Sequence, residues 1–120
     1  MATILVIDDE QVIRSILHAL LEEDGHQVLE ASNGRVGLNL YEERQVDLII
    51  TDIVMPEMSG IDVILELTKR RPNVKVIAMS GGLKSESVLR LAKTLGARRT
   101  FHKPFNVEEM LISVRDVLTQ

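Results

Sequence analysis

Short apolar runs alternate with amphipathic segments along the whole chain, and this alternation constrains the fold more than any other feature of the sequence. Runs rich in β-branched residues are typical of strands that helices cover on both faces of a parallel sheet. Strand and helix patterns in alternation indicate βαβ units, and 120 residues is the size of one domain. We therefore predict an α/β fold of five βα units, with strands at residues 3–7, 28–29, 48–50, 74–79 and 100–102.

The segments between these strands carry apolar residues at helical spacing, and each apolar stripe is expected to face the sheet. Strands 28–29 and 100–102 are shorter and more polar, so at least one of them is expected near a sheet edge. Gly34 and Gly37 weaken the second helix by up to about 1 kcal/mol each. The predicted stripes are Val12, Ile13, Ile16, Leu17, Leu20 and Leu21; Val36, Leu40 and Tyr41; Ile61, Ile64 and Leu65; Val88, Leu91, Ala92 and Leu95; and Val107, Met110, Leu111, Val114 and Leu118.

Residues that favour helix ends flank these segments. Asparagine and serine cap helix N-termini because their side-chain oxygens accept hydrogen bonds from free backbone N–H groups. Glycine adopts the left-handed conformation that ends a helix, and proline cannot continue one. The predicted N-caps are Asn33, Ser59 and Asn106, and the predicted helix ends lie at Gly25, Pro72 and Gly96.

Composition and charge exclude several classes of protein. No apolar run approaches the roughly 20 residues of a membrane helix and no signal peptide opens the chain, so we expect a cytoplasmic protein without a membrane partner. The net charge of −4 and the single Tyr and two Phe argue against direct nucleic-acid binding. No linker or repeat is present, so residues 1–120 are expected to form one domain without an attached output domain.

Polar residues follow the predicted strands at the points where the strands end. Asp8 and Asp9 follow the first strand, Asp52 the third, Ser80 the fourth and Lys103 the fifth. Ligands of open parallel sheets bind outside the carboxyl ends of the strands. We therefore expect three carboxylates, a hydroxyl and an ammonium to meet at one edge of the sheet.

These residue types point to phosphate chemistry with a hard metal ion. Clustered carboxylates repel one another unless a cation lies among them, and the chain has no cysteine, so oxygen ligation of Mg²⁺ by Asp9 and Asp52 is expected. Lys103 would neutralise a transferring phosphoryl group, and Ser80 would donate a hydrogen bond to it. Gly81 would let the backbone approach the phosphate closely. Spacing alone leaves open which of the three aspartates is the nucleophile.

Four motifs occur in one order at the successive strand ends: Ile7-Asp8-Asp9-Glu10, residues 52–60, Met79-Ser80-Gly81 and Lys103-Pro104-Phe105. Together they resemble the receiver domain of bacterial two-component response regulators, in particular the single-domain, chemotaxis-regulator type. The resemblance spans essentially the whole chain. It implies a doubly wound, flavodoxin-like sheet with strand order 2-1-3-4-5, and a signalling domain that catalyses its own phosphorylation and dephosphorylation rather than an enzyme.

The resemblance also implies a role for each matching residue. Asp52 would take phosphate from a phosphohistidine on a sensor histidine kinase or a phosphotransfer protein. Asp9, Asp52 and the backbone carbonyl of Val54 would ligate Mg²⁺, and Asp8 would orient metal-bound water. Lys103 would contact the phosphoryl group.

A conformational switch completes what the resemblance implies. Ser80 would move toward the phosphoryl group and bias the face formed by the fourth helix, fifth strand and fifth helix, which would then bind an unknown downstream protein or leave phosphate to be relayed onward. Thr100 stands where the family usually has an aromatic switch residue, and Phe101 lies on the opposite face of the strand. Val54 and Gly82, at the positions that tune phosphate lifetime in the family, cannot orient an attacking water, so a phosphoryl group that is not especially short-lived is expected.

Other interpretations remain open at this point. The chain could be a receiver-like scaffold that acts without phosphorylation, or a Mg²⁺-dependent phosphohydrolase with an aspartate nucleophile, although the second residue after Asp52 is Val54 where such enzymes usually have aspartate. Ile13 and Ile16, with Pro104, occupy positions that resemble the family's kinase-docking patch, but the spacing of the two isoleucines fits a core face equally well. No site is assigned to the histidines, which fall on separate elements without metal-ligand spacing: His18, His26 and His102.

Overall fold

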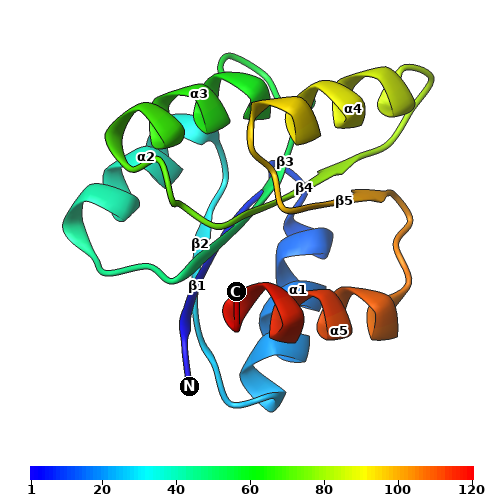
Figure 1. The fold of residues 1–120 in the computed structure, drawn as a ribbon. Coiled ribbons are helices and arrows are strands. Elements are labelled where there is room, and N and C mark those ends of the chain that lie inside the picture. The colour runs from blue at the N-terminus through cyan, green and yellow to red at the C-terminus, as the bar shows by residue number, and fades with distance from the viewer.

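The computed structural model describes residues 1–120 as a five-stranded parallel sheet flanked by five helices (Figure 1). The strand order is β2-β1-β3-β4-β5, as predicted, so the two less buried strands, β2 and β5, both lie at edges of the sheet. None of the helices is both long and apolar enough to cross a membrane. The strands are β1 Thr3–Ile7, β2 Gln27–Ala31, β3 Leu48–Asp52, β4 Val76–Ser80 and β5 Arg99–His102, and the helices are α1 Gln11–Glu23, α2 Gly34–Glu43, α3 Gly60–Arg70, α4 Ser85–Leu95 and α5 Val107–Leu118.

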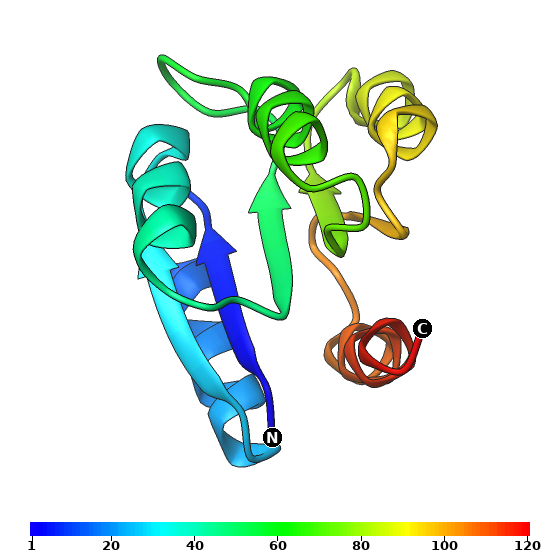
Figure 2. The same ribbon diagram turned by 60° about the vertical axis from the view of Figure 1, so that its left-hand side comes forward.

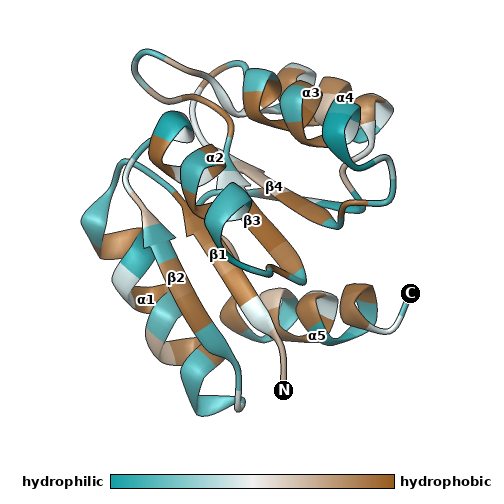
Figure 3. Ribbon diagram, turned by 90° about the vertical axis from the view of Figure 1, so that its left-hand side faces the viewer, coloured by the Kyte–Doolittle hydropathy of each residue, from teal (hydrophilic) through white to brown (hydrophobic).

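Helices cover both faces of the sheet, which explains why its central strands are apolar throughout. Helices α2, α3 and α4 lie on one face, and α1 and α5 lie on the other (Figures 1 and 2). Successive side chains of a strand point to opposite faces, so a strand covered on both sides needs apolar residues at every position. Strand β3 is buried along its whole length, and Figure 3 shows the hydrophobic colouring concentrated on the central strands.

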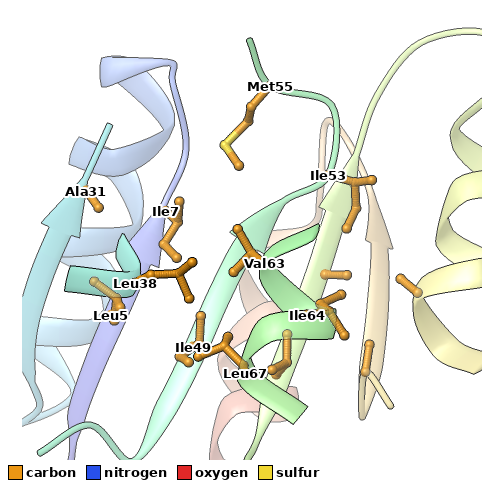
Figure 4. Packing of buried hydrophobic residues seen from close by; sticks show 14 of the residues in the cluster. Leu5, Ile7, Ala31, Leu38, Ile49, Ile53, Met55, Val63, Ile64 and Leu67 are labelled. Carbon is orange, nitrogen blue, oxygen red and sulfur yellow. The ribbon is translucent and has the colours of Figure 1, made fainter. Parts of the chain in front are cut away.

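Alternate strand residues supply two separate hydrophobic cores. Leu5 and Ile7 of β1 pack toward α2 and α3, together with Val63, Ile64 and Leu67 of α3 (Figure 4). Ile4 and Val6 of the same strand belong to the other core, with residues of α1 and α5: Leu17, Leu21, Met110, Val114 and Val117. The strand positions in both cores are essentially free of solvent, so the sheet is a rigid support for whatever lies at its ends.

The predicted helix ends are confirmed. The side chains of Asn33, Ser59 and Asn106 each accept a hydrogen bond from the backbone N–H three residues later, at 2.9, 3.3 and 2.9 Å. Gly25 and Gly96 follow α1 and α4 with φ of 89° and 126°, a backbone conformation that side-chain-bearing residues rarely adopt. Helix α3 ends at Arg70, before Pro72.

Two features of the predicted elements are wrong, namely where β4 begins and which residues of the helical stripes are buried. Strand β4 begins at Val76 rather than at residue 74, because the N–H of Val74 turns back to the carbonyl of Arg71. Val12, Ile16 and Val107 belong to the predicted apolar stripes, but their exposed fractions are 69%, 42% and 44%. Val36, Leu65 and Leu91, from the same stripes, are 40%, 47% and 46% exposed. The buried side chains lie two residues further along or back, at Leu38, Leu67 and Leu89. Helical spacing gives the width of an apolar stripe, whereas packing on the sheet decides which part of it is covered.

Ile13 and Ile16, for which two roles were open, differ in their packing. Ile13 packs against the core between the sheet and α1 and α5. Ile16 is 42% exposed on the same helix. The core interpretation therefore holds for Ile13, whereas Ile16 is available on the surface of α1.

Gly37 is a poor helix former within α2, but its lack of a side chain lets the helix pack closely on β1. A Cβ atom at Gly37 would lie 2.4 Å from Cδ1 and 2.8 Å from Cγ1 of Ile7, which is itself buried. We expect Gly37→Ala to lower the free energy of unfolding by about 1–3 kcal/mol in urea denaturation, even though alanine favours helix. Asn39→Ala, at an exposed position of the same helix, is the control and should be neutral or stabilising. Equal effects of the two substitutions would contradict this account of Gly37.

Candidate functional site

Four strands of the sheet end in polar residues at the same edge. Asp8 follows β1, Asp52 ends β3, Ser80 ends β4 and Lys103 follows β5. The parallel ladder continues just past the strands, since the N–H of Lys103 donates to the carbonyl of Ser80 at 2.8 Å. Asp8 and Ser80 are fully buried and Asp52 is 4% exposed, so folding withdraws these polar groups from bulk water.

The ammonium of Lys103 lies at the centre of this cluster. Its Nζ is 2.8 Å from Oδ2 of Asp8, 2.9 Å from Oε1 of Glu10 and 3.3 Å from Oδ2 of Asp52. The Lys103 side chain is only 11% exposed, so these charges interact with little screening by water. The predicted meeting of carboxylates and an ammonium at this edge is thus seen in the structure.

The carboxylate cluster contains Glu10, whereas the sequence predicted Asp9. Carboxylate oxygens of Asp8, Glu10 and Asp52 lie within 4.8 Å of one another, whereas Asp9 is exposed and outside this group. Glu10 was not singled out as a site residue. The signal that could have found it is the run of three successive acids, Asp8-Asp9-Glu10, because a long side chain at its third position can reach back to the strand ends.

Asp8 is fixed mainly by hydrogen bonds with the main chain. Its N–H donates to the carbonyl of Ala31 at 3.1 Å, and its Oδ1 accepts from the N–H of Glu10 at 2.9 Å. Its Oδ2 is buried and faces the Lys103 ammonium at an angle that makes no hydrogen bond. One oxygen of Asp8 is therefore held in place while the other keeps acceptor capacity.

The loop after β3 holds Asp52 through unusually close backbone packing. Oδ1 of Asp52 accepts from the N–H of Ile53 at 3.0 Å, and the N–H of Gly60 donates to the carbonyl of Ile53 at 2.7 Å. A Cβ atom at Gly60 would lie 2.2 Å from the carbonyl oxygen of Asp52, so only glycine fits at the start of α3. Val54, two residues after Asp52 in the same loop, is 62% exposed.

Ser80 and Gly81 border the cluster on the β4 side. The Ser80 hydroxyl donates to the carbonyl of Gly81 at 3.4 Å, a long hydrogen bond that is weakly held. A Cβ atom at Gly81 would lie 3.3 Å from Cβ of Lys103, so glycine leaves room for the lysine stem. Thr100 is half-buried on β5, and Phe101 packs into the core on the α1 and α5 side, opposite to Thr100 as predicted.

The histidines lie outside the carboxylate cluster, and each has its own polar partner. Nδ1 of His18 is 2.6 Å from Oε2 of Glu30, Nδ1 of His26 accepts from the N–H of Ala2, and Nδ1 of His102 is 2.9 Å from Oγ of Ser85. The three rings come from α1, from the turn before β2 and from β5. No single site therefore brings them together.

Burial and mutual repulsion change the acidity of the cluster. Burial and, next in size, the charge of Asp8 raise the pKa of Asp52 to about 6, because the Lys103 ammonium only partly opposes them. Burial also raises the pKa of Asp8 above its usual range, against the opposing effect of Lys103. For Lys103, burial lowers the pKa, but the nearby carboxylates of Asp8, Glu10 and Asp52 outweigh it and hold the pKa above its usual value. The site therefore carries more negative charge than one ammonium offsets.

The residues at this edge fit a divalent metal of the Mg²⁺ type. The donors are carboxylate oxygens, among them the buried Oδ2 of Asp8, which accepts no hydrogen bond, and the chain has no cysteine to offer a thiolate. A divalent cation would offset the repulsion that raises the pKa of Asp52.

Sequence comparison relates the chain to regulators of bacterial signalling. Residues 4–115 match the response regulator receiver domain family. The chain is 35% identical to the chemotaxis protein CheY of Thermotoga maritima over 95% of both chains. It is 37% identical to the DNA-binding transcriptional regulator NtrC of Azospirillum brasilense over 98% of this chain and 24% of that protein. It thus spans about a quarter of NtrC, and 49% of a probable transcriptional regulatory protein of Picosynechococcus that is 35% identical to it.

Solved structures show the same architecture at this level of identity. A response regulator receiver domain protein from Clostridium thermocellum superposes with a TM-score of 0.93 at 36% identity, covering 99% of this chain and 95% of the other. The response regulator TrrA from Thermotoga maritima, solved in complex with Mg²⁺ and BeF, gives a TM-score of 0.87 at 33% identity, covering 98% and 99%. The likeness therefore extends over the whole sheet and all the strand ends that carry the cluster.

Proposed function

The chain belongs to the response regulator receiver domain family, and on that premise we propose that it accepts a phosphoryl group on Asp52 in a Mg²⁺-dependent reaction. Members of this family are signalling domains rather than enzymes that act on a separate substrate. The observation that carries the proposal is the placement of Asp52, which is nearly buried at a strand end, 3.3 Å from the Lys103 ammonium. A carboxylate so placed can attack phosphorus while a cation neutralises the transferred group.

The ionised state of Asp52 at neutral pH supports its role as the acceptor. Even with a pKa of about 6 in the metal-free site, the carboxylate is ionised at neutral pH, and a bound cation would favour the ionised, nucleophilic form further. Glu10 is less suited because its side chain is 61% exposed at the rim of the site, whereas burial alone does not separate Asp52 from Asp8. The choice of Asp52 over Asp8 follows the role that the family resemblance implies for Asp52.

Asp9, Asp52 and the backbone carbonyl of Val54 would hold the Mg²⁺ ion, and Asp8 would act on it through water. When bound, the ion would offset the charge of the phosphoryl oxygens and of the carboxylates around them. Asp9 and Val54 are exposed, which suits ligands that share the ion with water. Lys103 would then exchange its contact with Asp52 for one with the phosphoryl group.

Ser80 supports the switching part of the proposal. Its hydroxyl makes only a 3.4 Å bond to the neighbouring carbonyl, so little opposes its turning toward a phosphoryl oxygen. Gly81 would let the backbone beside it approach the same group. Such a movement would bias the face formed by α4, β5 and α5, with half-buried Thr100 in place of the usual aromatic residue. This face would bind a downstream protein, unless the phosphate is relayed onward.

The phosphodonor would be a sensor histidine kinase or a phosphotransfer protein, and the reaction would take place in the cytoplasm. The prediction that residues 1–120 act as one domain without an attached output domain stays a prediction. The chain spans only a quarter to a half of two of its regulator relatives. The phosphohydrolase interpretation has no support beyond the sequence, whereas the scaffold interpretation is decided by the following experiment.

Incubation with Mg²⁺ and acetyl phosphate, followed by intact mass measurement, tests the function directly. We expect the wild-type protein to gain the mass of one phosphoryl group, and we expect no gain in the Asp52→Asn variant or in metal-free buffer. Because Val54 and Gly82 offer no group to orient an attacking water, decay of the adduct after donor removal should not be fast. No adduct in the folded, Mg²⁺-loaded wild type would instead favour the phosphorylation-independent scaffold.

A further inference from the structure

A side chain from outside the cluster holds the backbone of Asp8. Nη1 of Arg14, in the second turn of α1, donates to the carbonyl of Asp8 at 2.7 Å, a short distance that fits a charge-assisted bond. The other contacts of Asp8 are with the main chain of Ala31 and Glu10 and with the ammonium of Lys103. Arg14 is therefore the only residue that anchors Asp8 through a side chain not itself in the cluster.

Arg14 is in turn oriented by Glu30, which lies on the edge strand β2. Nε of Arg14 donates to Oε1 of Glu30 at 3.2 Å, and the other oxygen, Oε2, is held at 2.6 Å by Nδ1 of His18. The Arg14 side chain is only 15% exposed, so its planar guanidinium has little freedom to leave this arrangement. One guanidinium thus links the turn after β1 to the neighbouring strand.

Besides Arg14, main-chain hydrogen bonds and the Lys103 ammonium hold the turn after β1, but no side-chain cap does. Helix α1 begins after Glu10, whose side chain makes no capping bond to the first turn of the helix, unlike the caps of α2, α3 and α5. The turn carries Asp8 and Asp9, two of the residues that would act on the metal ion. Small displacements of such groups weaken metal sites, and residues that only support ligands commonly contribute ten-fold or more to metal affinity.

We propose that Arg14, oriented by Glu30, is a positioning residue for the Mg²⁺-dependent reaction. It fixes the turn of Asp8 and Asp9 without touching the metal ion or the phosphoryl group. The inference rests on the proposed function and adds a residue pair to it. Neither Arg14 nor Glu30 belongs to the four motifs at the strand ends.

The sign of the effect separates positioning from simple electrostatics. Arg14 carries a positive charge close to the carboxylates, so if charge alone mattered, Arg14→Ala would strengthen the binding of a divalent cation. Loss of positioning weakens that binding instead. Arg14→Lys keeps the charge but cannot make two fork-like bonds to two acceptors, so it should behave like Arg14→Ala rather than like the wild type.

The test measures Mg²⁺ affinity by titration calorimetry in the full chain, for the wild type and for Arg14→Ala, Arg14→Lys and Glu30→Gln. We expect about ten-fold weaker Mg²⁺ binding in both Arg14 variants and a smaller loss in Glu30→Gln. Arg90→Ala, on an exposed pair of α4 with side chains 73% and 80% exposed, is the matched control and should bind Mg²⁺ like the wild type. All measurements use one pH, because the hydrogen bond to Glu30 raises the pKa of His18.

A second readout needs no metal. Amide exchange at Glu10, whose N–H bonds to Oδ1 of Asp8, should be faster in Arg14→Ala than in Arg90→Ala at equal global stability in urea. Unchanged or tighter Mg²⁺ binding in folded Arg14 variants would overturn the proposal, and so would full recovery by lysine. If Arg14→Ala does not fold, Arg14→Lys and Glu30→Gln decide the question alone. Absence of Mg²⁺ binding in the wild type would instead overturn the proposed function, and this inference with it.

Discussion

Replacing Asp52 with asparagine is expected to raise the free energy of unfolding by about 1–3 kcal/mol at pH 7 in metal-free buffer. The pKa of Asp52 is about 6 in the folded protein, against an ordinary value of 3.8. The folded state therefore binds this proton more tightly than the unfolded state. The stability that comes from protonated Asp52 is fully present at pH values below the ordinary pKa, and it is lost as the pH rises through the pKa of the folded state. At pH 7 the wild-type protein must keep an ionised Asp52 in its folded state and so lacks this stabilisation, whereas the asparagine side chain of the variant carries no charge.

Urea denaturation of both proteins between about pH 4 and 7 measures this effect, since that window spans the ordinary and the raised pKa of Asp52. The difference in stability should grow with pH and should shrink when Mg²⁺ is added, because the ion binds the carboxylate and not the amide. Glu86→Gln, on an exposed pair of α4, makes the same chemical change and should stay within about 0.5 kcal/mol of the wild type. A neutral or destabilising Asp52→Asn across this range would show that the carboxylate is not strained.

Replacing Lys103 with methionine is expected to have the opposite effect and to lower the free energy of unfolding at pH 7 by about 3 kcal/mol in metal-free buffer. Methionine retains much of the apolar stem but removes the cation that lies within 3.3 Å of both Asp8 and Asp52. The pKa of each carboxyl group then rises further, so the lost stability should return as the pH falls and protons replace the ammonium.

Three comparisons check this account of Lys103 by urea denaturation. Mg²⁺ should restore part of the stability, and Asp52→Asn combined with Lys103→Met should cost less than Lys103→Met alone. Lys84→Met, at an exposed lysine before α4, should change stability by less than about 0.5 kcal/mol. A loss that is independent of both pH and Mg²⁺ would point to packing of the lysine stem rather than to its charge.

The sequence predicted the features that depend on local patterns. The apolar runs located the five strands, and the residues directly after them located Asp8, Asp52, Ser80 and Lys103, because parallel strands bring their carboxyl ends to one edge. Caps such as Asn33 and Ser59 were predictable because a capping side chain acts within three residues of its own position.

Features that depend on contacts between distant elements were not predictable in this way. Helical spacing could not show that Leu38 rather than Val36 faces the sheet, since that depends on how α2 lies on β1 and β2. Glu10 joins the cluster only because Lys103 arrives from β5, 93 residues along the chain. The support of Asp8 by Arg14 depends in the same way on Glu30 of a neighbouring strand.

The assembly of the site from the ends of four strands couples its occupancy to the folding of the chain. Asp8 and Lys103 are brought together only when β1, β3, β4 and β5 are aligned in one sheet, so an unfolded chain offers no comparable arrangement of charges. Any cation that binds the aligned carboxylates thus stabilises the folded state, by about 2.7 kcal/mol at a concentration one hundred times its Kd. The free energy gained from the bound ion would then offset the stability lost through substitutions in either core, even where these lie far from the site.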